Sequence, residues 1–181
     1  MDAAVIATTP VSRFFIRLMA ALTESRLRCH FFGADRILRG AEVGTGMSVL
    51  EIGCGTGYFT IPTARRLGER GRLVAMDTLR MSVDAVTTRV RAAGLINVEV
   101  IRGDALDTGL AEHRFDIVLV FGVIPAPMLP MDSLLSEMRR VLKPGGVMAV
   151  WPATWVHRGI ASSLHFRFTD KREGVLRYVR T

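Results

Sequence analysis

The sequence predicts one α/β domain built on a mostly parallel β-sheet. From residue 47 onward, short runs rich in apolar and β-branched residues alternate with amphipathic segments of helical period, the pattern of strand–helix–strand units. Residues 115–121 form a nearly continuous apolar run, as expected for a strand buried on both faces. No stretch rich in Gly, Pro or Ser divides the chain, and its 181 residues suffice for one domain with a short extension.

The first half of this domain is predicted to alternate strands with helices. These elements comprise residues 47–52, 58–67, 72–76, 79–93 and 98–102. The first strand stops at a glycine cluster, which indicates a turn into the following helix. Thr78 is a suitable N-cap for the second helix, Gly94 ends it, and Val83, Val86 and Val90 give it an apolar face.

The second half continues the alternation and closes with two strands in succession. Its strands and helices comprise residues 115–121, 133–142, 147–151, 155–161, 164–169 and 175–180. Leu134, Leu135 and Met138 form an apolar stripe on the first of these helices. The Lys-Pro-Gly-Gly run at 143–146 is expected to end that helix in a turn, and residues 170–174 to join the last two strands as a hairpin.

Composition restricts the class of protein. Hydrophobic residues make up 49% of the chain and charged residues 23%, which allows a sizeable core. No run approaches the roughly 18 apolar residues of a membrane-spanning helix, and the first residues lack the basic region of a secretory signal. Cys29 and Cys54 cannot make a disulfide framework or a cysteine-based zinc site. We therefore expect a soluble cytoplasmic domain.

The formal net charge of +7 raises the question of a polyanionic partner. Of 24 basic residues, only Lys143 and Lys171 are lysine, and the arginines are scattered without a run of five like charges. This pattern favours a solvated basic surface. A footprint for RNA or another polyanion is the alternative.

The glycine cluster Gly53-Cys54-Gly55-Thr56-Gly57 lies where the first strand gives way to a helix. Glycines at alternate positions let the backbone turn tightly and approach a ligand closely. A nucleotide-like cofactor is the natural ligand for such a loop. The dinucleotide pattern G-x-G-x-x-G is broken because Tyr58 stands where the third glycine is needed, and no Gly-Lys-Ser/Thr follows to make a P-loop.

The run at 49–59, Val-Leu-Glu-Ile-Gly-Cys-Gly-Thr-Gly-Tyr-Phe, resembles the first motif of class I S-adenosylmethionine-dependent methyltransferases. Further matches to that family follow in order at Asp77, 103–105, 115–118 and 140–146. The resemblance covers roughly residues 43–152 and is greatest to the small-molecule branch that includes quinone methyltransferases. It implies a Rossmann-like, doubly wound sheet of seven strands, mostly parallel, with the last strand antiparallel.

The resemblance also implies a cofactor site for S-adenosyl-L-methionine. The glycines would pass beneath the aminoacyl part and ribose, and Glu51 would accept a hydrogen bond from the ammonium group. Asp77 would accept both ribose hydroxyls, while Asp104 and the Ala105 amide would meet the adenine. The full predicted cofactor set is Glu51, Gly53, Cys54, Gly55, Gly57, Asp77, Thr78, Asp104, Ala105 and Phe121.

The implied reaction is in-line displacement of a methyl group from a sulfonium by a nucleophile of the substrate. Alignment and exclusion of water supply most of the catalysis, so a general base is needed only when the nucleophile must lose a proton early. His157, just beyond the fifth strand, is a weak candidate for that base. The segment 121–127 lacks the Asn/Asp-Pro-Pro-Phe/Tyr motif of enzymes that methylate base amines, and no acidic metal ligands occur there. We expect no metal.

Three functions stay open: transfer to a small molecule, which we favour, transfer to RNA, and a methyltransferase-like module that binds without catalysis. The predicted division is a helical segment at 1–45 and the methyltransferase domain at 46–181. Phe14, Phe15 and Leu18 share one face of that segment. It is expected either to pack permanently on the sheet or to cover a small-molecule site at the carboxyl edge, within one chain or across a homodimer.

Overall fold

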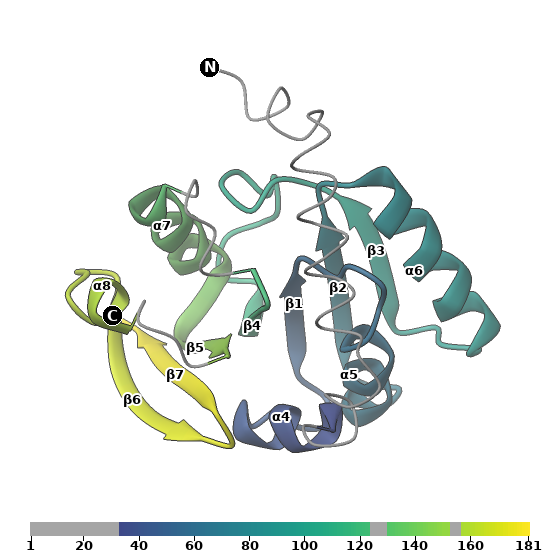
Figure 1. The fold of residues 1–181 in the computed structure, drawn as a ribbon, viewed down its shortest axis with the longest axis horizontal. Coiled ribbons are helices and arrows are strands. Elements are labelled where there is room, and N and C mark those ends of the chain that lie inside the picture. Colours follow the sequence, from purple (N-terminus) through teal and green to yellow (C-terminus); the bar gives the residue numbers. More distant parts are fainter. Residues whose placement is uncertain (1–32, 124–129, 153–156) are drawn as a thin grey trace. The chain divides into compact units, whose positions relative to one another are not determined.

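A computed structural model describes residues 33–123, 130–152 and 157–181, and its residues Ala34–Thr181 form one compact unit. A seven-stranded sheet runs through this unit in the order β3-β2-β1-β4-β5-β7-β6 (Figure 1). The strands are β1 (Ser48–Ile52), β2 (Arg72–Asp77), β3 (Val98–Arg102), β4 (Phe115–Phe121), β5 (Leu142–Trp151), β6 (Phe166–Arg172) and β7 (Val175–Arg180). The pairings among β1 to β5 are parallel, and β7 is antiparallel to both its neighbours. The predicted fold class is confirmed.

Helices cover both faces of the sheet. The described helices are α4 (Ala34–Gly40), α5 (Thr60–Leu67), α6 (Arg80–Ala92), α7 (Met131–Val141) and α8 (His157–Ala161). Alternate residues of β4 divide the core between the two faces: Val118 and Val120 pack with α7 and α8, whereas Leu119 packs with α4 and α5. Val86 of α6 packs on the latter face, against Ala75. Both faces of β4 are buried, as its apolar run predicted.

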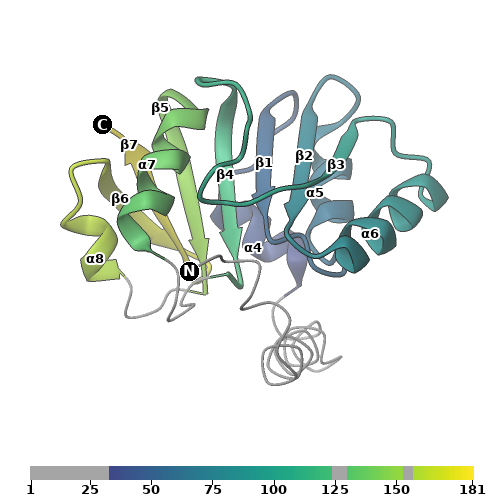
Figure 2. The same cartoon turned by 90° about the horizontal axis from the view of Figure 1, so that it is seen from above.

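The strand order reverses between β1 and β4. From β1 the chain moves outward to β2 and β3 and then returns to β4 on the other side of β1, as Figure 2 shows for the strands side by side. Loops that leave the carboxyl ends of two such neighbouring strands diverge, and ligands of open α/β sheets bind in the resulting crevice. This edge of the sheet is therefore where a ligand site is expected.

Local differences from the predicted elements have physical reasons. Thr78 is not the N-cap of α6, because the helix begins at Arg80 and its N-cap is Leu79. The Asp77 side chain accepts the Leu79 N–H. The predicted turn at 143–146 is part of β5, which pairs with β4 through a register shift. The hairpin turn is shorter than expected, because β6 extends to Arg172 and the turn is Glu173-Gly174. Both turn residues have positive φ, as a two-residue turn of type I′ requires.

The N-terminal helix and cover predicted within residues 1–32 lie outside the described residues. In the described remainder of that segment, Ile37, Leu38, Ala41 and Val43 belong to the core. Among the described residues, no helix is both long enough and apolar enough to span a membrane.

Candidate functional site

The loops that follow β1, β2 and β3 meet at the carboxyl edge of the sheet. The glycine loop after β1 is bound to the end of β2, because the Met76 carbonyl accepts the N–H groups of Gly53 (2.8 Å) and Cys54 (3.0 Å). The segment after β3 is bound to the same strand, since Gly103 N–H donates to the Asp77 carbonyl at 3.1 Å. The glycine loop, the end of β2 at Asp77 and the segment after β3 were predicted from separate motifs, and they therefore lie side by side.

The glycines of this loop have different neighbours. A Cβ on Gly53 (φ +71°) would lie 2.5 Å from Val123 Cγ2, so this glycine makes room for the protein's own chain after β4. For a Cβ on Gly55 (φ +54°), the nearest atom among the described residues would be the Gly53 carbonyl oxygen at 3.9 Å. Gly57, at the end of the loop, donates its N–H to the Cys54 carbonyl. Within the described part of the chain, the space beside Gly55 is thus the part of the loop that a ligand can approach.

Asp77 organises two of the loops at once. Its Oδ2 accepts the Gly55 N–H and its Oδ1 accepts the Leu79 N–H, both at 2.9 Å. The residue is half-buried, and the neighbouring Thr78 is exposed. A carboxylate oxygen can accept more than one hydrogen bond, so Asp77 can hold these amides and still bind hydroxyl groups of a ligand.

Asp104 and Ala105 follow β3 in a tight turn. The Asp104 Oδ1 accepts the Leu106 N–H at 2.9 Å, and the Asp104 carbonyl accepts the Asp107 N–H at 3.2 Å. Both predicted residues are partly exposed. The turn presents a carboxylate and a backbone amide next to the end of β2, as recognition of a base edge requires.

Glu51 is nearly buried at the end of β1, with 2% of its surface exposed. The Thr60 hydroxyl of α5 donates to its Oε2 at 2.7 Å. Burial is the main cause that raises the pKa of Glu51 to about 8; the Asp77 charge adds to the rise, and the Thr60 hydrogen bond opposes it. Glu51 is therefore mostly protonated at neutral pH when nothing positive lies beside it.

Cys54 and Phe121, the two remaining predicted residues, are buried. Burial and the charges of Glu51 and Asp77 raise the pKa of the Cys54 thiol, so a reactive thiolate is disfavoured. The Phe121 ring contacts Phe59 edge to face at 4.9 Å between centroids, and Phe59 contacts Trp151 at 5.8 Å. The Phe121 side chain is thus a member of an aromatic cluster at the ends of β4 and β5.

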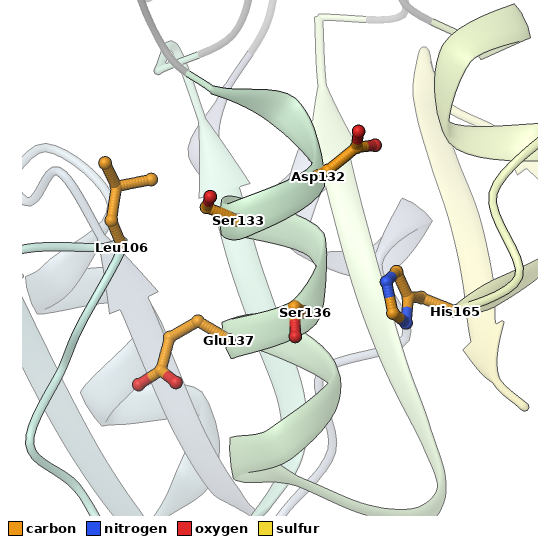
Figure 3. A pocket seen from close by; sticks show the side chains of 6 residues that line it. All are labelled: Leu106, Asp132, Ser133, Ser136, Glu137 and His165. Carbon is orange, nitrogen blue, oxygen red and sulfur yellow. The ribbon is translucent and has the colours of Figure 1, made fainter.

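The histidines lie in different parts of the fold. His157 is the first residue of α8, after β5. His113 precedes β4, at the opposite edge of the sheet, with Nε2 2.9 Å from an Arg180 guanidinium nitrogen. His165 lies beside α7 (Figure 3). His30 is outside the described residues. Among the described residues, no group of three or more His, Cys, Asp or Glu side chains is arranged to hold a metal ion.

Two arginines that the sequence did not single out support the site loops. Arg89 of α6 donates to the Thr56 carbonyl in the glycine loop, and Arg102 donates to the Thr78 carbonyl at 3.1 Å. Neither contact has a sequence signal, because each joins segments more than 20 residues apart. By contrast, Arg65 and Arg66 lie in the last turn of α5 and Arg72 begins β2, so these three arginines are at the far edge of the sheet from Asp77.

The fold and this site correspond to one family of proteins. The family model for the methyltransferase domain matches residues 49–146, more than half of the chain, and the chain belongs to this family. The match begins within β1 and ends in the first part of β5. It therefore contains the glycine loop and the three predicted carboxylates, Glu51, Asp77 and Asp104.

Curated relatives and solved structures agree with this assignment. The chain is 32% identical over 138 residues to a demethylmenaquinone methyltransferase of Geobacillus stearothermophilus, covering 76% of this chain and 57% of the relative. Identity is 33% to the protein of that name from Staphylococcus aureus, covering 66% and 48%. The chain thus spans about half the length of the curated relatives it matches. A SAM-dependent methyltransferase structure from Aquifex aeolicus shares the fold, with a TM-score of 0.79 at 20% identity, covering 92% of this chain and 98% of that one.

Proposed function

We propose that this chain is an S-adenosylmethionine-dependent methyltransferase that acts on a small-molecule acceptor. The observation that carries the proposal is the convergence of three features at one edge of the sheet. These features are the Gly55 backbone, with no described atom closer than 3.9 Å to its Cβ position, the half-buried Asp77 carboxylate and the turn that carries Asp104. A neutral ribose and an adenine, without phosphate, match this set of acceptors and explain why no P-loop is needed.

Each predicted residue has a defined task in this proposal. Asp77 accepts the ribose hydroxyls, and Asp104 with the Ala105 amide reads the adenine edge. Gly55 lets the backbone approach the ligand. Glu51 becomes ionised when the ammonium group of the ligand lies near it. When bound, the cofactor supplies a methyl group on a sulfonium, which is electrophilic without further activation.

The chain's own contribution to catalysis is alignment of two reactants in a site that excludes water. Phe59, Phe121 and Trp151 are each less than 10% exposed and pack together as an aromatic cluster at the carboxyl ends of β4 and β5. Because the relatives bear the name demethylmenaquinone methyltransferase, a reduced naphthoquinone lacking the ring methyl is the first acceptor to assay.

Calorimetric titration with S-adenosylhomocysteine tests the cofactor part of the proposal. We expect saturable binding by the folded protein, and methyl transfer from S-adenosylmethionine to the reduced naphthoquinone in a coupled assay. Absence of binding by folded protein would overturn the methyltransferase proposal. Binding with transfer to RNA but not to the naphthoquinone would overturn the choice of acceptor class and leave the cofactor site intact.

Alanine at Gly55 is expected to reduce affinity for S-adenosylhomocysteine by about tenfold or more, because a Cβ would occupy the ligand's side of the loop. The left-handed backbone adds a folding cost of about 1–2 kcal/mol. Gly94→Ala is the matched control, since Gly94 also has a left-handed φ (+64°), with no described atom within 4 Å of its Cβ position, but lies after α6. It should lose similar stability and retain full affinity. Equal affinities of the two variants, measured by titration, would show that Gly55 does not face the ligand.

A further inference from the structure

The segment between β3 and β4 carries the predicted adenine-binding residues but contains no helix of its own. Asp104 and Ala105 lie at its start, and the chain reaches β4 only at Phe115. Its position therefore depends on contacts with its neighbours. Leu106 and Leu110 pack against the core on the α7 side of the sheet, and apolar packing of this kind restrains a segment without fixing the orientation of its polar groups.

Glu137 of α7 supplies the directional contacts. Its carboxylate accepts four hydrogen bonds: two from Thr108, through N–H at 2.9 Å and the hydroxyl at 2.6 Å, and two from Arg140, at 2.7 and 2.8 Å. Arg140 also donates to the Leu110 carbonyl at 2.8 Å. Figure 3 shows Glu137 pointing from α7 toward the segment that carries Leu106. One side chain thus joins α7 to the middle of the segment.

The anchored residue lies immediately after the turn that carries Asp104. That turn is closed by the Asp107 N–H on the Asp104 carbonyl, so Thr108 is the next residue in the chain. Glu137 is 8% exposed and Thr108 also 8%. The ion pair of Glu137 with Arg140, whose side chain is 38% exposed, contributes little net stability, whereas the hydrogen bonds of Glu137 fix direction. This arrangement is therefore suited to fixing the orientation of the turn that carries Asp104.

We propose that Glu137 is a positioning residue for the adenine end of the cofactor site, holding Thr108 and thereby the turn that presents Asp104 and Ala105. This inference rests on the proposed function. It concerns residues outside the predicted cofactor set, and Glu137 itself touches no ligand. The hydrogen bonds from Arg140 and Thr108 lower the pKa of Glu137 to about 2, so the anchor keeps its charge across the neutral range.

The test uses Glu137→Gln in the full chain, titrated with S-adenosylhomocysteine and with adenosine. We expect both affinities to fall by about tenfold, the value of one or two misplaced hydrogen bonds. Asp116→Asn is the matched control, because Asp116 also accepts a backbone N–H (Ser48, 2.8 Å) and a cation (Lys143, 2.7 Å), but at the opposite edge of the sheet. The affinities of Asp116→Asn for both ligands should change less than twofold, although its free energy of unfolding falls about as much as that of Glu137→Gln.

A double-mutant cycle separates positioning from general loosening of the domain. In an Asp104→Ala background, Glu137→Gln should reduce the affinity by clearly less than the tenfold expected in the wild type, since one of the two groups that it positions is gone. Thr108→Val leaves the ion pair of Glu137 with Arg140 intact and should lower the affinity for S-adenosylhomocysteine by about threefold. This variant keeps the test decisive if Glu137→Gln does not fold. The inference would be overturned if Glu137→Gln and Thr108→Val both bound with wild-type affinity, or if their losses equalled that of Asp116→Asn. It would also be overturned if the effects of Glu137→Gln and Asp104→Ala were fully additive. A wild-type protein that does not bind S-adenosylhomocysteine would instead overturn the proposed function.

Discussion

Replacement of Asp77 by alanine is expected to weaken binding of S-adenosylhomocysteine by roughly tens- to hundreds-fold. Two charge-assisted hydrogen bonds to the ribose, worth together about 2–4 kcal/mol, would be lost. The same change removes the acceptor for the Gly55 and Leu79 N–H groups. The two loops that carry the cradle should therefore loosen as well, which places the loss toward the upper end of this range. Calorimetric titration of folded protein measures the effect.

Two comparisons make the Asp77 result specific. Asp77→Asn keeps one carbonyl oxygen as an acceptor but removes the charge, and we expect an intermediate loss. Asp116→Ala removes a half-buried carboxylate from the other edge of the sheet and should lower stability without lowering affinity. If folded Asp77→Ala protein bound the ligand as tightly as wild type, the ribose site would have to lie elsewhere.

Glu51 is expected to make the stability of the ligand-free protein depend on pH. Its pKa rises from the ordinary value of 4.5 to about 8 on folding, so the folded state favours the protonated form. The contribution of this group is therefore fully present below pH 4.5, declines above it, and is lost as pH passes through about 8. Glu51→Gln should remove this decline in the free energy of unfolding, measured by urea denaturation between pH 5 and pH 9. An identical pH dependence in wild type and variant would contradict the assignment.

The same group should release a proton when the cofactor binds. A ligand ammonium beside Glu51 stabilises the carboxylate and lowers its pKa, so at pH 7 binding converts a protonated side chain to an ionised one. Calorimetry in buffers of different ionisation enthalpy measures the protons released. We expect close to one more proton from wild type than from Glu51→Gln, and an affinity that rises with pH up to about 8 in the wild type only. An equal proton count would place the ammonium away from Glu51.

The ends of strands were the most predictable part of this molecule. The bounds of β3, β4 and β7 agree with those expected from the sequence, because each is a short run rich in apolar or β-branched residues, and a glycine directly follows β3 and β4. The meeting of the glycine loop, Asp77 and Asp104 also follows from the sequence, since the loop follows β1, Asp77 ends β2 and Asp104 lies two residues after β3. In a parallel sheet such residues meet at one edge, whatever the length of the intervening helices.

The supporting contacts could not be predicted, because they join residues that have no fixed spacing in the chain. Thr60 reaches Glu51 only because α5 packs over the end of β1, and Glu137 reaches Thr108 from 29 residues away. Nor did the sequence distinguish Gly53, which makes room for Val123, from Gly55, whose Cβ position has no described atom closer than 3.9 Å. That distinction depends on the path of the chain after β4.

A crystal structure with S-adenosylhomocysteine is the most direct test of the proposed site. We expect the ribose hydroxyls on the Asp77 carboxylate, the adenine between the end of β2 and the turn at Asp104, and the aminoacyl part over Gly55 with its ammonium toward Glu51. The ligand's sulfur should face the ends of β4 and β5. A ligand bound at another edge of the sheet, or bound here with Asp77 and Asp104 both outside hydrogen-bonding distance, would contradict this account.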